Sequence, residues 1–286
     1  MLISSSALGR ELRSETIEVD RRATMAYAAG LGALRPCYLD DLREERVIAP
    51  PAFCVVPEWT IINGGDFRQS LGVDNENAWR GIQVYQDTIF HRPVCAPERL
   101  IAAGRVTEIR QTSIGAMVTA TFTTHAANDG QPVSETWWST IYVGMTCEAP
   151  RVAVAPPKVP HADGRENVEQ VRIEVPRFLP HIYSECAGIW NPIHTERAIA
   201  KRNGLPDIIT HGTAIWALVG EALIDRIGEG QPSRLKRLAC RFKTAVIPGT
   251  AIHLNLSRSD VAGAIFFTVE NDTQKSVLTD GFAEFA

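Results

Sequence analysis

The sequence has little of what marks membrane, secreted or nucleic-acid-binding proteins. No stretch reaches the roughly 18 consecutive apolar residues of a membrane span, and the apolar stretch after Met1 is shorter than that of a signal peptide. Lys and Arg form no run, and the formal net charge of -4 gives no electrostatic footprint for a nucleic acid or an anionic membrane. We therefore expect a cytoplasmic protein that binds neither nucleic acids nor membranes.

Cysteine is scarce and scattered. The six cysteines form no Cys-x-x-Cys pair and no short Cys/His spacing of the kind that binds zinc. In a chain of cytoplasmic character such cysteines are expected to stay reduced and to act as small apolar side chains. The sequence also lacks a Gly-rich phosphate loop. It therefore predicts neither a metal nor a redox cofactor.

What the sequence does contain is an internal repeat. Its 286 residues, 45% of them hydrophobic, suffice for one large core or two ordinary ones. Three blocks match in the same order: residues 27–40 with 183–196, residues 49–53 with 209–213, and residues 90–94 with 242–246. Ordered matching of this kind indicates a duplicated unit of about half the chain.

The proline distribution separates the two units. Residues 147–165 contain four prolines and show little periodicity, and such density disfavours both helix and interior strand. We interpret this segment as an extended linker. The predicted domains are therefore residues 1–146 and residues 166–286.

Both domains are expected to contain an irregular Gly/Pro stretch, then a helix, then a run of strands. Residues 213–227 are apolar nearly all round, as in a buried helix. Its first-domain counterpart is expected to begin only near Glu58, after several prolines. The predicted strands are residues 82–90, 100–109, 115–125 and 133–143, then 237–243, 251–258, 264–270 and 276–285. An antiparallel sheet wrapped on each helix is an α+β arrangement.

Residues 183–196 read Tyr-Ser-Glu-Cys-Ala-Gly-Ile-Trp-Asn-Pro-Ile-His-Thr-Glu, and His211-Gly212 follows just before the apolar helix. This pattern resembles the hydratase motif of MaoC-like (R)-specific enoyl-CoA hydratases and dehydratases. The resemblance covers nearly all of the second domain, and the first domain resembles the N-terminal domain of two-domain members. It implies a double-hotdog fold in which the first domain is catalytically silent and shapes an acyl-binding tunnel.

Three residues are the candidates for catalysis. Hydration of an enoyl thioester needs a base for water, a proton donor for the α carbon, and donors that face the thioester oxygen. His194 exchanges protons near neutral pH, and the N–H of Gly212 is free at the start of a helix, where the helix dipole reinforces it. Asn191 is expected to position the His194 turn or to contact the water. The first domain has other residues at these three positions: Tyr38, Ala52 and Arg35. We therefore predict one site per chain.

One residue departs from the family motif. The motif has an Asp five residues before its His, and this chain has Ile189 there. The acid is expected either to be replaced by Glu185, one helical turn earlier, or by a carboxylate of the substrate itself. The side chains predicted to contact the substrate are those of His211, Ile189, Trp190 and Thr213.

Structural roles for the same residues stay open at this point. A single His in a turn is often a hydrogen-bonded structural residue, and His211 either lines the pocket or binds a neighbouring backbone group. Gly212 also suits tight helix packing.

The leading hypothesis is a hydro-lyase of fatty acid metabolism, which adds water reversibly to a 2-enoyl thioester. The thioester carrier is CoA or acyl-carrier protein, and self-association as a dimer is expected. The alternative is a non-catalytic acyl-thioester-binding subunit that needs an active partner chain. A hotdog thioesterase is a third option, for which Glu221 is the only acid on the predicted central helix before residue 225.

Overall fold

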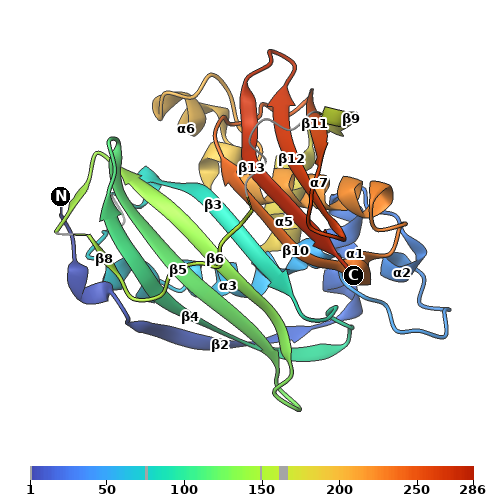
Figure 1. Ribbon diagram of the computed structural model, residues 1–286. Helices are drawn as coiled ribbons and strands as arrows, with labels where there is room; N and C mark the ends of the chain where they lie inside the picture. Colours follow the sequence, from blue (N-terminus) through green and yellow to red (C-terminus); the bar gives the residue numbers. More distant parts are fainter. Residues whose placement is uncertain (1, 75–76, 149, 161–166) are drawn as a thin grey trace.

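The computed structural model describes residues 2–74, 77–148, 150–160 and 167–286. Its main feature is an antiparallel sheet that runs through both halves of the chain (Figure 1). The first half supplies β2 (Glu11–Val19), β3 (Gly81–Phe90), β4 (Glu98–Gln111), β5 (Gly115–Ala126) and β6 (Pro132–Val143). The second half supplies β9 (Asn167–Val175), β10 (Leu235–Phe242), β11 (Thr250–Arg258), β12 (Ala264–Asn271) and β13 (Ser276–Phe285).

The strand order shows the duplication directly. Along the sheet it runs β2-β4-β5-β6-β3-β10-β13-β12-β11-β9, so the second half repeats the order of the first in reverse. The halves join where β3 pairs with β10, with Tyr85 opposite Arg241 and Ile89 opposite Arg237. This pairing satisfies the backbone groups of both strands and leaves β2 and β9 as the edges of the sheet.

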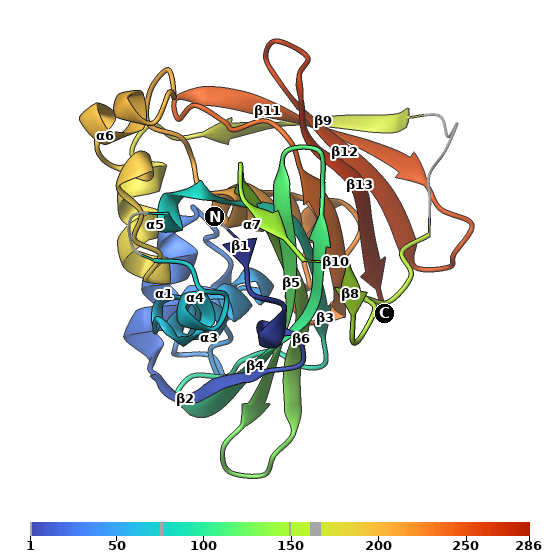
Figure 2. The same cartoon turned by 90° about the vertical axis from the view of Figure 1, so that its left-hand side faces the viewer.

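The helices lie together on one side of the sheet (Figure 2). They are α1 (Arg21–Gly30), α2 (Pro36–Leu39), α3 (Val55–Asn63), α4 (Asp66–Ser70), α5 (Leu179–Ala187), α6 (Arg197–Arg202) and α7 (Gly212–Arg226). The central helix of the second half is α7, and its counterpart α3 follows a 3-10 turn at Pro51–Cys54. None of the described helices has the length and apolar composition needed to cross a bilayer.

Local sequence explains where the flanking helices begin and end. The Asp20 carboxylate accepts a hydrogen bond from the Ala23 N–H at 2.7 Å and caps the first turn of α1. Helix α5 ends at Gly188, whose φ of 66° lies in the left-handed region that glycine adopts without a steric cost. The hydroxyls of Tyr27 on α1 and Tyr183 on α5 are 3.2 Å apart, so the two repeat-related tyrosines meet where the halves pack.

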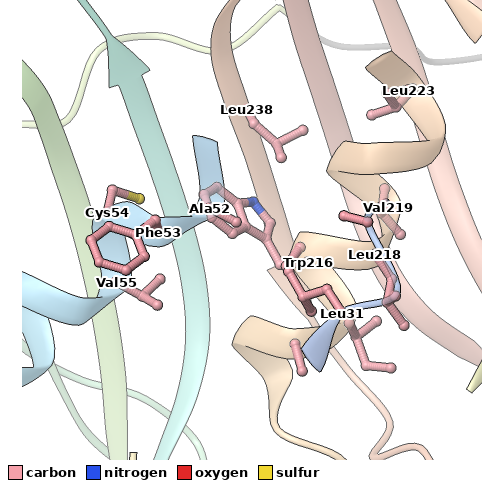
Figure 3. Packing of buried hydrophobic residues seen from close by; sticks show 14 of the residues in the cluster. Leu31, Ala52, Phe53, Cys54, Val55, Trp216, Leu218, Val219, Leu223 and Leu238 are labelled. Carbon is pink, nitrogen blue, oxygen red and sulfur yellow. The ribbon is translucent and has the colours of Figure 1, made fainter. Parts of the chain in front are cut away.

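The central helix also packs across the junction. Trp216 of α7 is fully buried and lies beside the Ala52–Val55 segment of the first half (Figure 3). Its ring stacks on that of Phe90 with a centroid distance of 6.3 Å. The halves therefore share one core, to which aromatic burial contributes most per residue.

The structure confirms the predicted α+β class, because antiparallel strands wrap a central helix in each half. Each predicted strand is present with bounds that shift by a few residues. The irregular stretches predicted before the central helices were wrong in part. Each contains a strand and a helix, namely β2 and α1 in the first half and β9 and α5 in the second. Both edge strands carry many charged residues, so their apolar alternation is weak.

The predicted linker is only partly irregular. Its first residue closes the short strand β7 (Thr146–Cys147), which pairs with β1 (Leu2–Ile3), and β8 (Arg151–Val152) pairs with β4. Residues 149 and 161–165 of the predicted linker and residue 166 of the second domain lie outside the described residues.

Candidate active site

A cavity of about 350 Å³ lies where α7 begins, between the two halves. Most of its lining is apolar, which suits an acyl chain. The second half contributes the side chains predicted from sequence at His194, His211, Thr213, Asn191 and Ile189. The first half contributes Trp59 from α3 and four residues of β3: Gly81, Ile82, Gln83 and Val84.

His194 has a fixed tautomer. It ends a 3-10 turn at Pro192–His194, and Asn191 caps this turn by accepting a hydrogen bond from the Ile193 N–H at 3.2 Å. The Nδ1–H of His194 donates to the Ile209 carbonyl at 2.8 Å. Because Nδ1 carries the proton, Nε2 carries the lone pair, and Nε2 has no hydrogen-bond partner among the described residues. Asn191 thus positions the turn, one of the two roles predicted for it.

Burial sets the protonation state of His194. It lowers the pKa of the imidazole to about 4, and the hydrogen bond to the Ile209 carbonyl opposes this only in part. At neutral pH the ring is therefore uncharged and ready to accept a proton. A neutral imidazole with a free Nε2 is the form that a general base requires.

His211 supports His194 from one side. The two rings stack with centroids 3.7 Å apart and planes inclined by 24°. The Nε2–H of His211 donates to the Ile189 carbonyl at 3.1 Å, so its Nδ1 carries a lone pair that has no partner among the described residues. Burial and the neighbouring His194 hold the pKa of His211 well below its ordinary value. His211 therefore both lines the cavity and binds a backbone group.

Gly212 is the first residue of α7, so no carbonyl within the helix accepts its N–H. A Cβ at this position would lie 3.2 Å from two ring carbons of Phe242. The glycine therefore leaves this space beside the Phe242 ring open at the cavity wall. Thr213 follows it and is buried at the cavity wall.

Two predicted site residues are not brought into the cavity. Trp190 is 58% exposed and does not line the cavity. Its neighbour Ile189 is 2% exposed and does line the cavity. Glu185 is exposed on α5 and is likewise absent from the lining. In the described part of the chain, no Asp or Glu lines this cavity.

The sequence predicted that the first half shapes the acyl-binding tunnel but did not identify the residues that do so. Trp59 and Gln83 both line the cavity, and neither belongs to a motif or aligns with a candidate residue of the second half. No sequence signal marks them, because only the pairing of β3 with β10 brings these segments to the start of α7.

Glu221, the acid on which a thioesterase hypothesis depends, does not line the cavity and is hydrogen-bonded to the first half. Its carboxylate accepts hydrogen bonds from the Tyr38 hydroxyl at 3.0 Å and from Arg35 Nε at 3.1 Å. Burial raises its pKa, and Arg35 opposes that shift. Tyr38 and Arg35 are the repeat counterparts of His194 and Asn191, so the first half uses these positions to fasten itself to α7.

A smaller pocket of about 30 Å³ lies at the repeat-related position. Its lining includes Ala49 and Phe90, the counterparts of Ile209 and Phe242. Trp216 stacks on Phe90 from the core side. The two repeat-related pockets thus differ about tenfold in volume, and the larger one holds the histidines.

Comparison with known proteins identifies both halves. The MaoC like domain matches residues 168–280, and the FAS1-like, dehydratase domain region matches residues 6–136. The 3-hydroxyacyl-thioester dehydratase Y of Mycobacterium tuberculosis is 24% identical over 100% of this chain and 99% of its own length. The peroxisomal enoyl-CoA hydratase 2 of Arabidopsis thaliana is 33% identical over 32% of this chain and 29% of its own length.

The fold comparison agrees with the sequence comparison. A solved MaoC-like dehydratase from Phytophthora capsici is similar with a TM-score of 0.83 and 18% identity, over 98% of each chain. A Mycobacterium tuberculosis protein described as having a double hotdog fold is also similar, with a TM-score of 0.60 and 12% identity, over 97% of this chain and 95% of its own. The predicted double-hotdog fold is therefore confirmed.

Proposed function

The chain carries a MaoC-like domain in its second half and a FAS1-like dehydratase region in its first, and on that premise we propose that it is a hydro-lyase using His194 as its only acid and base. The reaction is the reversible addition of water to a 2-enoyl thioester, with CoA or acyl-carrier protein as the carrier. The observation that carries the proposal is the neutral His194, whose Nε2 has no partner among the described residues, in a cavity that Gly212 also lines. This chemistry needs no metal or redox cofactor.

In the hydration direction one imidazole serves both proton transfers. His194 Nε2 takes a proton from water while the water oxygen bonds to C3 of the enoyl group. The electrons of the C2–C3 π bond move to the thioester oxygen, where the Gly212 N–H and the dipole of α7 stabilise the enolate. The protonated His194 then gives its proton to C2. Because one group handles both protons, water adds across one face of the double bond.

The polarity of the cavity favours a neutral acyl group. Lys243 is the only Lys or Arg among the described residues that line the cavity, and it is exposed. A carboxylate held deeper in the cavity than the exposed Lys243 would therefore have no cation partner among the described residues, which is costly. We propose that the substrate carries no carboxylate of its own, which removes it as a substitute for the missing Asp.

The test is hydration of trans-2-enoyl-CoA substrates by the purified chain, with crotonyl-CoA and a longer straight-chain enoyl-CoA. We expect activity that falls by about three orders of magnitude in His194→Ala. Equal rates for wild type and variant would refute the proposal.

The second candidate is a non-catalytic acyl-thioester-binding subunit. It is favoured by one observation, the lack of an acid among the described residues of the cavity wall. Calorimetric binding of enoyl-CoA without turnover, together with activity only after a partner chain is added, would support it. Release of free CoA thiol would instead indicate a thioesterase, for which the engaged Glu221 leaves no acid at the site.

The proposal places the enzyme in cytoplasmic fatty acid metabolism, as a dimer. All six cysteines are free in the structure, which suits a reducing compartment. The oligomeric state is measured by size-exclusion chromatography with light scattering, and a monomer mass would refute the dimer.

A further inference from the structure

One polar side chain reaches the cavity from the half that has no catalytic residues. Gln83 of β3 lines the cavity wall, and its Oε1 lies 3.7 Å from the point where a Cβ of Gly212 would be. Its Nε2 donates to Gln86 Oε1 at 2.8 Å. The amide is therefore held on one side and faces the start of α7 on the other.

Behind Gln83 runs a buried chain of hydrogen bonds. Gln86 Nε2 donates to Thr88 Oγ1 at 3.5 Å, and the Thr88 and Thr136 hydroxyls are 2.9 Å apart. The Thr136 hydroxyl donates to Glu58 Oε1 at 2.5 Å. These four residues are between 0% and 2% exposed. Buried polar groups cost free energy unless they are hydrogen-bonded, and this chain satisfies them through one another.

The hydrogen bonds all run from donor to acceptor in the same order, and this order sets the orientation of the Gln83 amide. With Glu58 Oε1 accepting from the Thr136 hydroxyl, Thr136 accepts in turn from Thr88. Thr88 then accepts from Gln86, and Gln86 accepts from Gln83. The Oε1 of Gln83 has no donor among the described residues. It is a free acceptor at the cavity.

A bulge in β3 makes this alignment possible. Residues three apart in a regular strand point to opposite faces. The register between β3 and β6 shifts between Gln83 and Tyr85, and such a bulge returns Gln83 to the face of Gln86.

The second half has no equivalent of this chain. In the repeat alignment, Leu235 corresponds to Gln83, Leu238 to Gln86, and Leu218 to Glu58. All three leucines are buried, so the same framework is stable with apolar side chains at these positions. The polar version occurs only behind the wall of the large cavity, which indicates a role at that cavity rather than in folding.

We infer that Gln83 Oε1 accepts a hydrogen bond from the water that His194 deprotonates, in place of the carboxylate that the chain lacks at Ile189. This inference rests on the proposed function. One hydrogen of the water faces His194 Nε2 and the other faces the Gln83 carbonyl oxygen. An amide oxygen takes up no proton at neutral pH, so every proton transfer still belongs to His194. Gln83 orients the water, and the chain to Glu58 orients Gln83.

The first test substitutes Gln83 and measures enoyl-CoA hydration. Gln83→Leu removes the acceptor at similar volume, and we expect kcat to fall about 10-fold to 100-fold with KM changed by less than about threefold. Gln83→Glu keeps an acceptor, and we expect kcat within about tenfold of wild type with an added acidic ionisation in its pH profile. Gln69→Leu, the same change at an exposed position of α4, is the matched control and should leave kcat unchanged.

The second test interrupts the series of hydrogen bonds behind Gln83, at its end far from the substrate. Glu58→Leu copies the residue that the repeat has at Leu218 and removes the acceptor of the buried Thr136 hydroxyl, so we expect a folded protein whose unfolding midpoint is lower than that of wild type by only a few degrees. Its kcat should nevertheless fall about fivefold or more, because Gln83 is no longer held. Glu58→Gln keeps an acceptor for Thr136 and should retain kcat within about twofold.

The outcomes separate this inference from the proposed function. Loss of activity in His194→Ala together with full kcat in Gln83→Leu would overturn the inference alone. A kcat loss in Gln83→Leu without the added ionisation in Gln83→Glu would also overturn it. If the wild-type chain hydrates none of the substrates, the proposed function fails first and the inference falls with it.

Discussion

At the scale of single residues, the site depends on histidines kept neutral by burial. His194 donates Nδ1–H to the Ile209 carbonyl, and His211 donates Nε2–H to the Ile189 carbonyl. Two backbone carbonyls therefore fix two tautomers. This arrangement leaves one imidazole nitrogen free for chemistry on His194, and stacking with His211 holds that ring in place.

The pH profile should reflect this burial. Because the pKa of His194 is lowered to about 4, the free enzyme keeps its base neutral well below the ordinary histidine range near 6.5. We expect kcat/KM to stay level from neutral pH down to about pH 5 and to fall as pH drops through about 4. Initial rates measured across this range test the prediction. An acidic limb centred near 6.5 would contradict it.

Glu58 should make the protein less stable as pH rises. Burial raises its pKa to about 8, while bonds to Thr136 and Cys54 oppose the shift. A raised pKa means that the unfolded chain releases this proton first, from its ordinary value of 4.5 upward. The free energy of unfolding should therefore decrease by up to about 1.4 kcal/mol per pH unit between about pH 5 and 8 through this group.

Chemical denaturation of wild type and Glu58→Gln at several pH values measures that contribution. We expect the difference in unfolding free energy to grow in favour of Glu58→Gln as pH rises. A difference that stays constant across the range would show that Glu58 does not titrate in this way.

At the scale of elements, α7 does two things at once. Its first turn presents the Gly212 N–H to the cavity, and its later turns carry Trp216 and Glu221 into contacts with the first half. The helix is apolar over most of its surface because both the sheet and the first half cover it. Its position therefore sets the geometry of the cavity.

Two glycines of α7 allow a matched test of the oxyanion role. Gly212→Ala puts a methyl group 3.2 Å from the Phe242 ring, next to the N–H at the cavity wall. We expect kcat/KM for enoyl-CoA to fall about 10-fold to 100-fold. Gly220→Ala also places its methyl group 3.2 Å from a neighbour, the flexible Leu238 side chain, and should retain activity. Equal losses in both variants would indicate a packing effect of alanine in α7 rather than loss of an oxyanion donor.

At the scale of the whole molecule, the two halves form one unit. The sheet is continuous through β3 and β10, and the fully buried Trp216 of the second half stacks on Phe90 of the first. The cavity wall likewise takes residues from both halves. The second half holds the candidate catalytic residues, while the first half has only the small pocket at the repeat-related position and supplies part of the wall of the large cavity.

Separated halves should therefore be unstable and inactive. We expect a chain of residues 166–286 to expose β10 and the contact face of α7 and to aggregate or remain unfolded by circular dichroism. Co-expression with residues 1–160 should restore soluble protein and enoyl-CoA hydration. A second half that is folded and fully active alone would show that the first half contributes nothing to the site.

The sequence by itself determined the elements with strong periodicity and the residues within one motif. Residues 213–227 identify α7, alternating residues identify the inner strands, and the motif with the His-Gly pair that follows it identifies His194, Asn191 and Gly212 as candidates. These features depend on contacts between residues close in sequence. The charged edge strands β2 and β9 and the helices α1 and α5 lack such a strong pattern, and the sequence did not predict them.

Only the tertiary structure decided what surrounds the histidine. It turned Trp190 outward, left Glu185 on the surface and engaged Glu221 with Arg35 and Tyr38. It also brought Gln83 to the start of α7, although a long stretch of chain separates them. Side-chain direction and long-range strand pairing are set by packing of the whole core, so no local pattern carries them.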